Sequence, residues 1–307
     1  MKIATTTLGT FGFLSSIVLA GTVASSVVTP APTACSDGFA QARRPISNPT
    51  LFDLALPTTN VHAIAIFHGL PDRINYGGKN IALGGDAQVY AIQFEYALND
   101  RLSIVATKDG YVDLDFDNTL ADQSGFANLA AGVKYAFILD PASRTAVSGT
   151  ATVEVPTGNR DVLQGEYDGL VNLSLNGLKL VNDWQFAGTA GVQIPFNDDQ
   201  AMSSYISAHV SYDLCKYFIP MVELNWFHVI SEGEGGQLIN PDFEGGDFFN
   251  LGSTNSSTNR DFVTAAFGFR SRLTDCVDVG AAYEIPLTDE EDGLMDDRIT
   301  LDLVWKF

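Results

Sequence analysis

Apolar and polar residues alternate along most of the chain after residue 60, and the clearest case is the C-terminus. One face of that segment carries Ile299, Leu301, Leu303, Trp305 and Phe307, and the other carries Arg298, Thr300, Asp302 and Lys306. A period of two residues is typical of a β-strand whose two faces meet different environments. A helical period of 3.6 residues is not seen in these segments. The pattern therefore predicts strands.

Twelve segments share this alternation. They span roughly 60–68, 88–98, 101–107, 125–138, 145–155, 169–180, 184–195, 202–213, 217–230, 260–272, 277–287 and 297–307. We therefore expect an all-β protein of about 12 antiparallel strands.

The links between these segments are short and long in strict alternation. Short turns are expected at 99–100, 140–141, 182–183, 215–216 and 274–275, and longer links at 69–87, 108–124, 156–168, 196–201, 231–259 and 288–296. This order is typical of a transmembrane up-and-down β-barrel with short periplasmic turns and longer extracellular loops. Residues 60–307 are thus predicted to form such a barrel in the outer membrane, in contact with its lipids.

The N-terminus has the features of an export signal. Lys2 precedes an apolar stretch at 11–20, and small residues follow. We expect a signal peptide within residues 1–42, cleaved after Ala20, Ala24 or Ala42. Residues 43–59 would then form an N-terminal periplasmic segment, and the pattern leaves open whether this segment hangs in the periplasm or plugs the barrel.

Charge narrows the choice of partners. Charged residues make up 18 % of the chain, yet the formal net charge is −20, and the acid gathers in the longer links. An acidic surface repels nucleic-acid phosphates, so no nucleic-acid partner is expected. The acidic extracellular loops would disfavour anionic solutes at the mouth of the barrel.

The final strand that ends on Phe, the signal peptide and the hairpin-linked strands resemble Gram-negative outer-membrane β-barrels over residues 50–307. Size and organisation are similar to the poorly characterised channel proteins grouped with aromatic-degradation and fatty-acid transporters. The resemblance implies that Leu301, Leu303, Trp305 and Phe307 form the signal read by the barrel-assembly machinery.

The polar face of the strands supplies the candidate lumen wall. Its charged members are Glu95, Lys134, Glu154, Glu223, Arg270, Glu284, Arg298 and Asp302. They favour a porin-like channel for passive or facilitated diffusion of small solutes, cation-preferring or neutral. The alternative is a closed structural or surface-interaction barrel in which the same charges form a salt-bridge belt.

Enzymatic chemistry has one remote candidate. His209 and Ser211 resemble the His-x-Ser of the outer-membrane phospholipase, with Asn225 on the next strand as a conceivable orienting residue. Both side chains fall on the polar face, whereas a lipid hydrolase must meet lipid. We therefore expect no enzyme, no catalytic residue and no cofactor.

Two further motifs are weaker. Asp113, Asp115 and Asp117 have the spacing of a calcium loop, but Asn118 and Ser124 stand where glycine and a bidentate glutamate are needed, so no metal site is expected. Cys215 and Cys276 fall in two predicted periplasmic turns and form a candidate disulfide. The turns are two strand spacings apart, near the limit of disulfide reach, and the pairing stays open.

Overall fold

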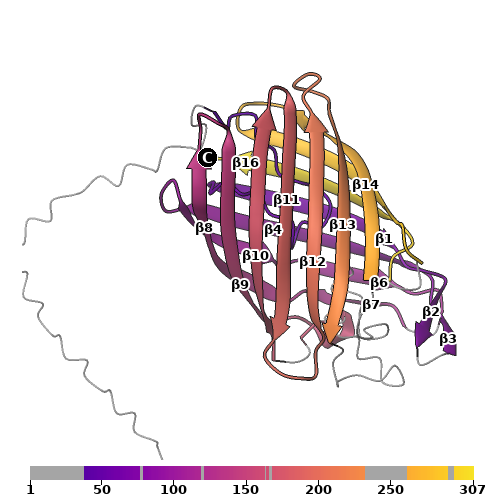
Figure 1. Ribbon diagram of the computed structural model, residues 1–307. Coiled ribbons are helices and arrows are strands. Elements are labelled where there is room, and N and C mark those ends of the chain that lie inside the picture. Colours follow the sequence, from indigo (N-terminus) through magenta and orange to yellow (C-terminus); the bar gives the residue numbers. More distant parts are fainter. Residues whose placement is uncertain are drawn as a thin grey trace, which may run out of the picture. The chain divides into compact units, whose positions relative to one another are not determined.

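The computed structural model describes residues 38–76, 79–118, 121–162, 164–165, 168–231, 261–289 and 294–307. Within them, twelve antiparallel strands form a closed barrel (Figure 1). The wall strands are β1 (Asn60–Gly69), β4 (Asp86–Ala97), β5 (Leu102–Lys108), β8 (Leu129–Asp140), β9 (Thr145–Val155), β10 (Leu170–Val181), β11 (Trp184–Pro195), β12 (Met202–Tyr212), β13 (Ile219–Ser231), β14 (Asp261–Arg272), β15 (Val277–Pro286) and β16 (Arg298–Lys306). The predicted all-β barrel is confirmed.

The barrel closes where its first strand meets its last. β1 pairs with β16 from Asn60 opposite Lys306 to His68 opposite Arg298. Its other edge pairs with β4 over the whole strand. Because every wall strand has two neighbours, no strand edge is left to expose unpaired backbone groups to lipid.

The predicted link at 108–124 is too long. β6 (Tyr111–Asp115) and β7 (Gln123–Phe126) continue β5 and β8 beyond an interruption, and β6 pairs with the first half of β4. The interruption lies at Gly110, whose φ of 127° is accessible to glycine at little cost. Asp113 and Asp115 therefore belong to a strand rather than to a calcium loop.

The link at 69–87 contains a short hairpin that the alternation did not reveal. It consists of β2 (Arg73–Tyr76) and β3 (Lys79–Ala82). The helix η1 (Arg160–Val162) is a single 3₁₀ turn. No helix in the described ranges is both long and apolar enough to cross a membrane.

The two faces of the wall differ as the alternation predicts. On β16, Leu301, Leu303 and Trp305 point outward and are 40–49 % exposed, whereas Arg298 and Thr300 are buried. The outward apolar side chains recur on the other wall strands, where they can face lipid. This division supports the location in the outer membrane.

The short connections lie at one end of the barrel, which we call the turn end, and the long connections lie at the other, the loop end. The loop between β13 and β14, at 232–260, lies outside the described residues. The described loops and turns otherwise alternate as expected.

Residues 39–57 lie inside the barrel, and we call them the lumen segment. The segment begins beside a turn, where Arg144 Nε donates to Gly38 O at 3.3 Å. Its deepest described part includes Asn48, whose side-chain amide reaches Ser207 Oγ at 3.4 Å. It returns to the turn end at Thr59, whose carbonyl accepts from Phe307 N at 3.0 Å. The sequence left open whether residues 43–59 hang in the periplasm or plug the barrel. In the structure they lie inside the barrel.

Apolar packing helps to hold the lumen segment in place. Its apolar side chains at the turn end are Phe39, Ala42, Leu54, Ala55 and Leu56, which cluster with Ala146, Leu178 and Leu180 of the wall. Deeper in the lumen, Ile46 is fully buried against Met221 and Ala282. Burial of this kind contributes about 25 cal/mol per Å² of apolar surface removed from water.

Candidate functional site: the charged lumen and its internal segment

All eight predicted lumen residues point inward and are at most 6 % exposed. The structure brings six of them together as three ion pairs between wall strands, of which Lys134 with Glu95 is described below. Arg298 Nη1 lies 3.2 Å from Glu284 Oε2, and Arg270 Nη2 lies 2.7 Å from Asp302 Oδ2. These charges belong to β14, β15 and β16, so the pairs tie three consecutive strands together on their inner face.

The second ion pair spans a strand that carries no side chain at the crossing point. Arg270 on β14 is opposite Gly280 on β15, which in turn is opposite Asp302 on β16. A Cβ atom at Gly280 would overlap Asp302 Oδ1 and lie 2.5 Å from Ile46 Cδ1. Glycine at this position therefore leaves room both for the ion pair and for the lumen segment.

Lys134 is the centre of a network that joins wall and lumen segment. Its ammonium group lies 2.8 Å from Asp53 of the segment and 3.0 Å from Glu95 of β4. Arg44, also of the segment, lies 3.4 Å from Asp53 and 4.0 Å from Glu95. Two cations thus face two carboxylates in a fully buried position, the arrangement that buried charge requires.

Glu223 binds the lumen segment rather than a neighbouring wall cation. Its carboxylate accepts from the backbone N–H of Ile46 at 3.1 Å and of Ser47 at 2.7 Å, and from Ser47 Oγ at 2.5 Å. A carboxylate that accepts several hydrogen bonds forms stronger ones than a neutral acceptor would. Glu223 is therefore an anchor for the segment.

The candidate hydrolase residues are within hydrogen-bond reach but closed off. His209 Nε2 lies 2.9 Å from Ser211 Oγ, and His209 Nδ1 lies 2.6 Å from Glu223 Oε1. Asn225, the conceivable orienting residue, donates its amide to Glu284 at 2.9 Å and to Ser47 at 3.1 Å, and the partner of His209 is Glu223 instead. Ser211 is 2 % exposed on the inner face, so it does not meet lipid, and it lines neither of the two cavities described below.

Glu154 has its partners near the loop end. Lys108 Nζ and Asn128 Nδ2 each donate to Glu154 Oε1 at 2.8 Å. Both donors flank the interruption between β5–β6 and β7–β8. The charge pair thus stabilises the wall where ladder hydrogen bonds are lost.

Several residues that shape the lumen were not predicted from the sequence to do so. They are Arg43, Arg44 and Asp53 of the lumen segment, and His62 and Gln93 of the wall. Two adjacent arginines and an aspartate ten positions after the first, in a stretch with no other charged residue, were a signal for ion pairs. His62 and Gln93 gave no signal beyond lying on the polar face.

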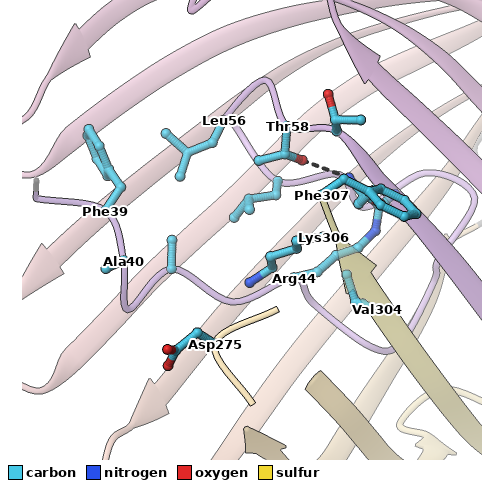
Figure 2. A pocket seen from close by; sticks show the side chains of 13 residues that line it. Phe39, Ala40, Arg44, Leu56, Thr58, Asp275, Val304, Lys306 and Phe307 are labelled. Atoms are coloured by element: carbon cyan, nitrogen blue, oxygen red, sulfur yellow. Dashed lines mark hydrogen bonds between the residues drawn. The ribbon is translucent and has the colours of Figure 1, made fainter. Parts of the chain in front are cut away.

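Two cavities lie inside the barrel, one toward each end. The turn-end cavity has an empty volume of about 600 Å³, part of it open to solvent, between the lumen segment and the end of β16. Figure 2 shows Arg44, Lys306 and Phe307 among the side chains around it. The loop-end cavity has an empty volume of about 560 Å³, likewise partly open, and is lined by residues that include Ile64, Gln93 and Lys108.

The remaining predicted site residues lie at the surface. Leu301, Leu303, Trp305 and Phe307 are 40–49 % exposed. The candidate disulfide is not formed, since Cys215 and Cys276 are exposed free thiols. In the described ranges, no three His, Cys, Asp or Glu side chains are grouped so that they could hold a metal ion.

Comparison with solved structures agrees with this architecture. The crystal structure of an outer membrane channel from Pseudomonas putida matches 86 % of this chain and 100 % of its own, with a TM-score of 0.60 and 16 % identity. The NanC porin matches 81 % of this chain and 100 % of its own, with a TM-score of 0.47 and 9 % identity. The first match shows a shared fold.

Comparison with curated proteins gives no match. A family model described as "Putative MetA-pathway of phenol degradation" matches residues 72–272, which include most of the barrel wall. Because the match extends over more than half of the chain, the protein belongs to this family of outer-membrane β-barrels.

Proposed function

We propose that the protein is an outer-membrane channel through which small solutes diffuse, and that the lumen segment controls its opening. The observation that carries the proposal is the composition of the barrel interior. Polar and charged side chains line the wall, and a separate stretch of chain closes it rather than a packed apolar core. The likeness to a solved outer-membrane channel supports the same reading.

Cavities at both ends of the lumen support this proposal. Each is partly open to solvent, and the lumen segment lies between them. A solute that enters from either end therefore meets the segment before it meets the other cavity. Conduction requires the segment to shift, so we expect brief openings and long closed times rather than a steady pore.

We further propose that the channel prefers cations or neutral solutes. The formal net charge of −20 gives the mouths of the barrel a negative potential. Solutes that carry negative charge would be depleted there at low ionic strength, and screening by salt would weaken the preference.

The alternative function is a closed structural or surface-interaction barrel. It is favoured by the buried ion pairs between wall and segment, such as Lys134 with Asp53. The two functions differ in whether the segment yields on the timescale of solute passage.

Single-channel recording in a planar lipid bilayer distinguishes the two. The refolded chain, with folding verified by its shift on unheated gel electrophoresis, is inserted and recorded in symmetric and then in asymmetric salt. Discrete current steps with a reversal potential on the cation side support the channel. A folded, inserted protein that passes no current would refute it and leave the closed barrel.

A further inference from the structure

The two cavities follow one side of the barrel. On β1, the inward side chains in order are Asn60, His62, Ile64 and Ile66. Asn60 lines the turn-end cavity, and Ile64 and Ile66 line the loop-end cavity. His62 lies between them, lines neither cavity and is fully buried. The four residue steps from Asn60 to Ile64 span about 13 Å of strand.

The neighbouring strand shows the same order. On β16, Lys306 and Val304 line the turn-end cavity, and Arg298 lines the loop-end cavity. Between them, Asp302 lies 2.8 Å from His62 Nε2. His62 is opposite Val304 and Asp302 is opposite Ile64, so the layer between the cavities takes one side chain from each strand, and the two meet diagonally across the ladder.

Two more residues complete this layer. Gln93 of β4 lines the loop-end cavity, and its Oε1 atom lies 3.0 Å from His62 Nδ1. Arg44 of the lumen segment lines the turn-end cavity, and its Nη2 atom donates to the same Gln93 oxygen at 3.2 Å. One hydrogen bond thus joins a side chain of one cavity to a side chain of the other.

We infer that solutes pass along the wall formed by β1, β4 and β16, and that the contact between Arg44 and Gln93 is the gate of this path. The inference rests on the proposed channel function and locates the barrier within it. His62, Gln93 and Asp302 are fixed to the wall, whereas Arg44 belongs to the lumen segment. Arg44 is therefore the part of the layer that can move without opening the barrel.

The adjacent arginine provides a matched control. Arg43 is buried in the same segment and pairs with Asp213 at 3.2 Å, but it lines neither cavity. Replacing either arginine by alanine removes one buried cation from the segment, together with the ion pair to Asp213 for Arg43 or the contacts with Asp53 and Glu95 for Arg44. The two variants therefore differ in whether the lost side chain lies at the gate.

The wall offers a second matched pair. Gln93 donates to the carbonyl of Pro49 at 3.0 Å, and Gln185 donates to the carbonyl of Arg43 at 2.7 Å. Both glutamines are buried and hold the segment, but Gln185 lines neither cavity. Gln93→Leu and Gln185→Leu keep the side-chain volume close to that of glutamine.

The test is single-channel recording of the full chain in its wild-type form and as Arg44→Ala, Arg43→Ala, Gln93→Leu and Gln185→Leu. Loss of a hydrogen bond to a charged group should raise the open fraction about tenfold in Arg44→Ala and Gln93→Leu. Arg43→Ala and Gln185→Leu loosen the same segment away from the gate, so they should raise the open fraction much less than the two gate variants do. Arg44→Ala should also shift the reversal potential toward cations, because a positive charge leaves the path, whereas Gln93→Leu should not.

Each contrary outcome has a distinct meaning. An equal rise in all four variants would show general release of the segment and would overturn the gate. A conducting wild type with Arg44→Ala and Gln93→Leu unchanged would overturn the gate and leave the channel intact. If none of the five proteins conducts, the proposed channel function and the proposed gate are both refuted. If Arg44→Ala does not fold, the comparison of Gln93→Leu with Gln185→Leu tests the gate instead.

Discussion

Replacing Lys134 by methionine should destabilise the barrel strongly, because Lys134 balances two buried carboxylates. Its ammonium group lies 2.8 Å from Asp53 and 3.0 Å from Glu95, and it is fully buried. Breaking a buried ion pair by removing one partner typically costs about 3–5 kcal/mol, since the remaining charge is left uncompensated. Methionine keeps the length of the side chain, so the loss of charge dominates.

The remaining cation sets the expected value within that range. Arg44 stays 3.4 Å from Asp53 and 4.0 Å from Glu95 and offsets part of the lost charge. We therefore expect the free energy of unfolding to fall by about 3 kcal/mol. A second change, Asp53→Asn, removes one of the two acids that Lys134 balanced and should restore part of the loss, so the two substitutions should not be additive.

The assay is denaturant unfolding of the refolded protein in detergent micelles, followed by fluorescence of its three tryptophans. Lys179→Met is the control, because Lys179 donates to Ser143 and Thr145 at a half-buried position near the turn end and has no buried carboxylate to balance. Its cost should stay within about 0.5 kcal/mol. A loss below about 1 kcal/mol for Lys134→Met, the range of an exposed ion pair, would refute the reasoning.

Three further predictions follow from packing and export. Gly280→Ala should lower the unfolding free energy by about 1–3 kcal/mol in the same assay, because the new Cβ overlaps Asp302 Oδ1. Gly177→Ala should change it little, since the nearest atom outside its chain neighbours lies 4.0 Å away. Phe307→Ala should reduce assembly in cells but leave detergent refolding unchanged, as heat-modifiability on gels would show. Cleavage after Ala42 would remove the buried start of the lumen segment, residues 39–42. We therefore expect the intact mass of the exported protein to include these residues, as cleavage after Ala20 or Ala24 would leave them.

The strands could be predicted from the sequence because each wall strand alternates between lipid and lumen. The predicted spans at 145–155 and 184–195 match β9 and β11 at both ends. The extension of β5 and β8 was missed because Gly110 and its neighbours interrupt the alternation. The hairpin of β2 and β3 was missed because four-residue strands are too short to show a period.

The candidate lumen residues could be assigned to a face but not to their partners. Alternation places Glu223 inside, yet the groups of the lumen segment that donate to it lie about 176 positions earlier in the chain. The lumen segment has no period of its own, because it packs irregularly on all sides rather than between lipid and water. Contacts between such a segment and a wall depend on the closed barrel and leave no local pattern.

The path of the lumen segment has a consequence for how it can leave. The segment begins beside Arg144 and ends beside Phe307, and both of these places are at the turn end. It therefore forms a loop that enters and leaves the barrel at the turn end, and it is not threaded through the barrel. Withdrawal requires neither a free chain end nor separation of β1 from β16. A force applied from the turn-end side can draw the segment out while the wall stays intact. When the force ends, the segment can return by the same opening.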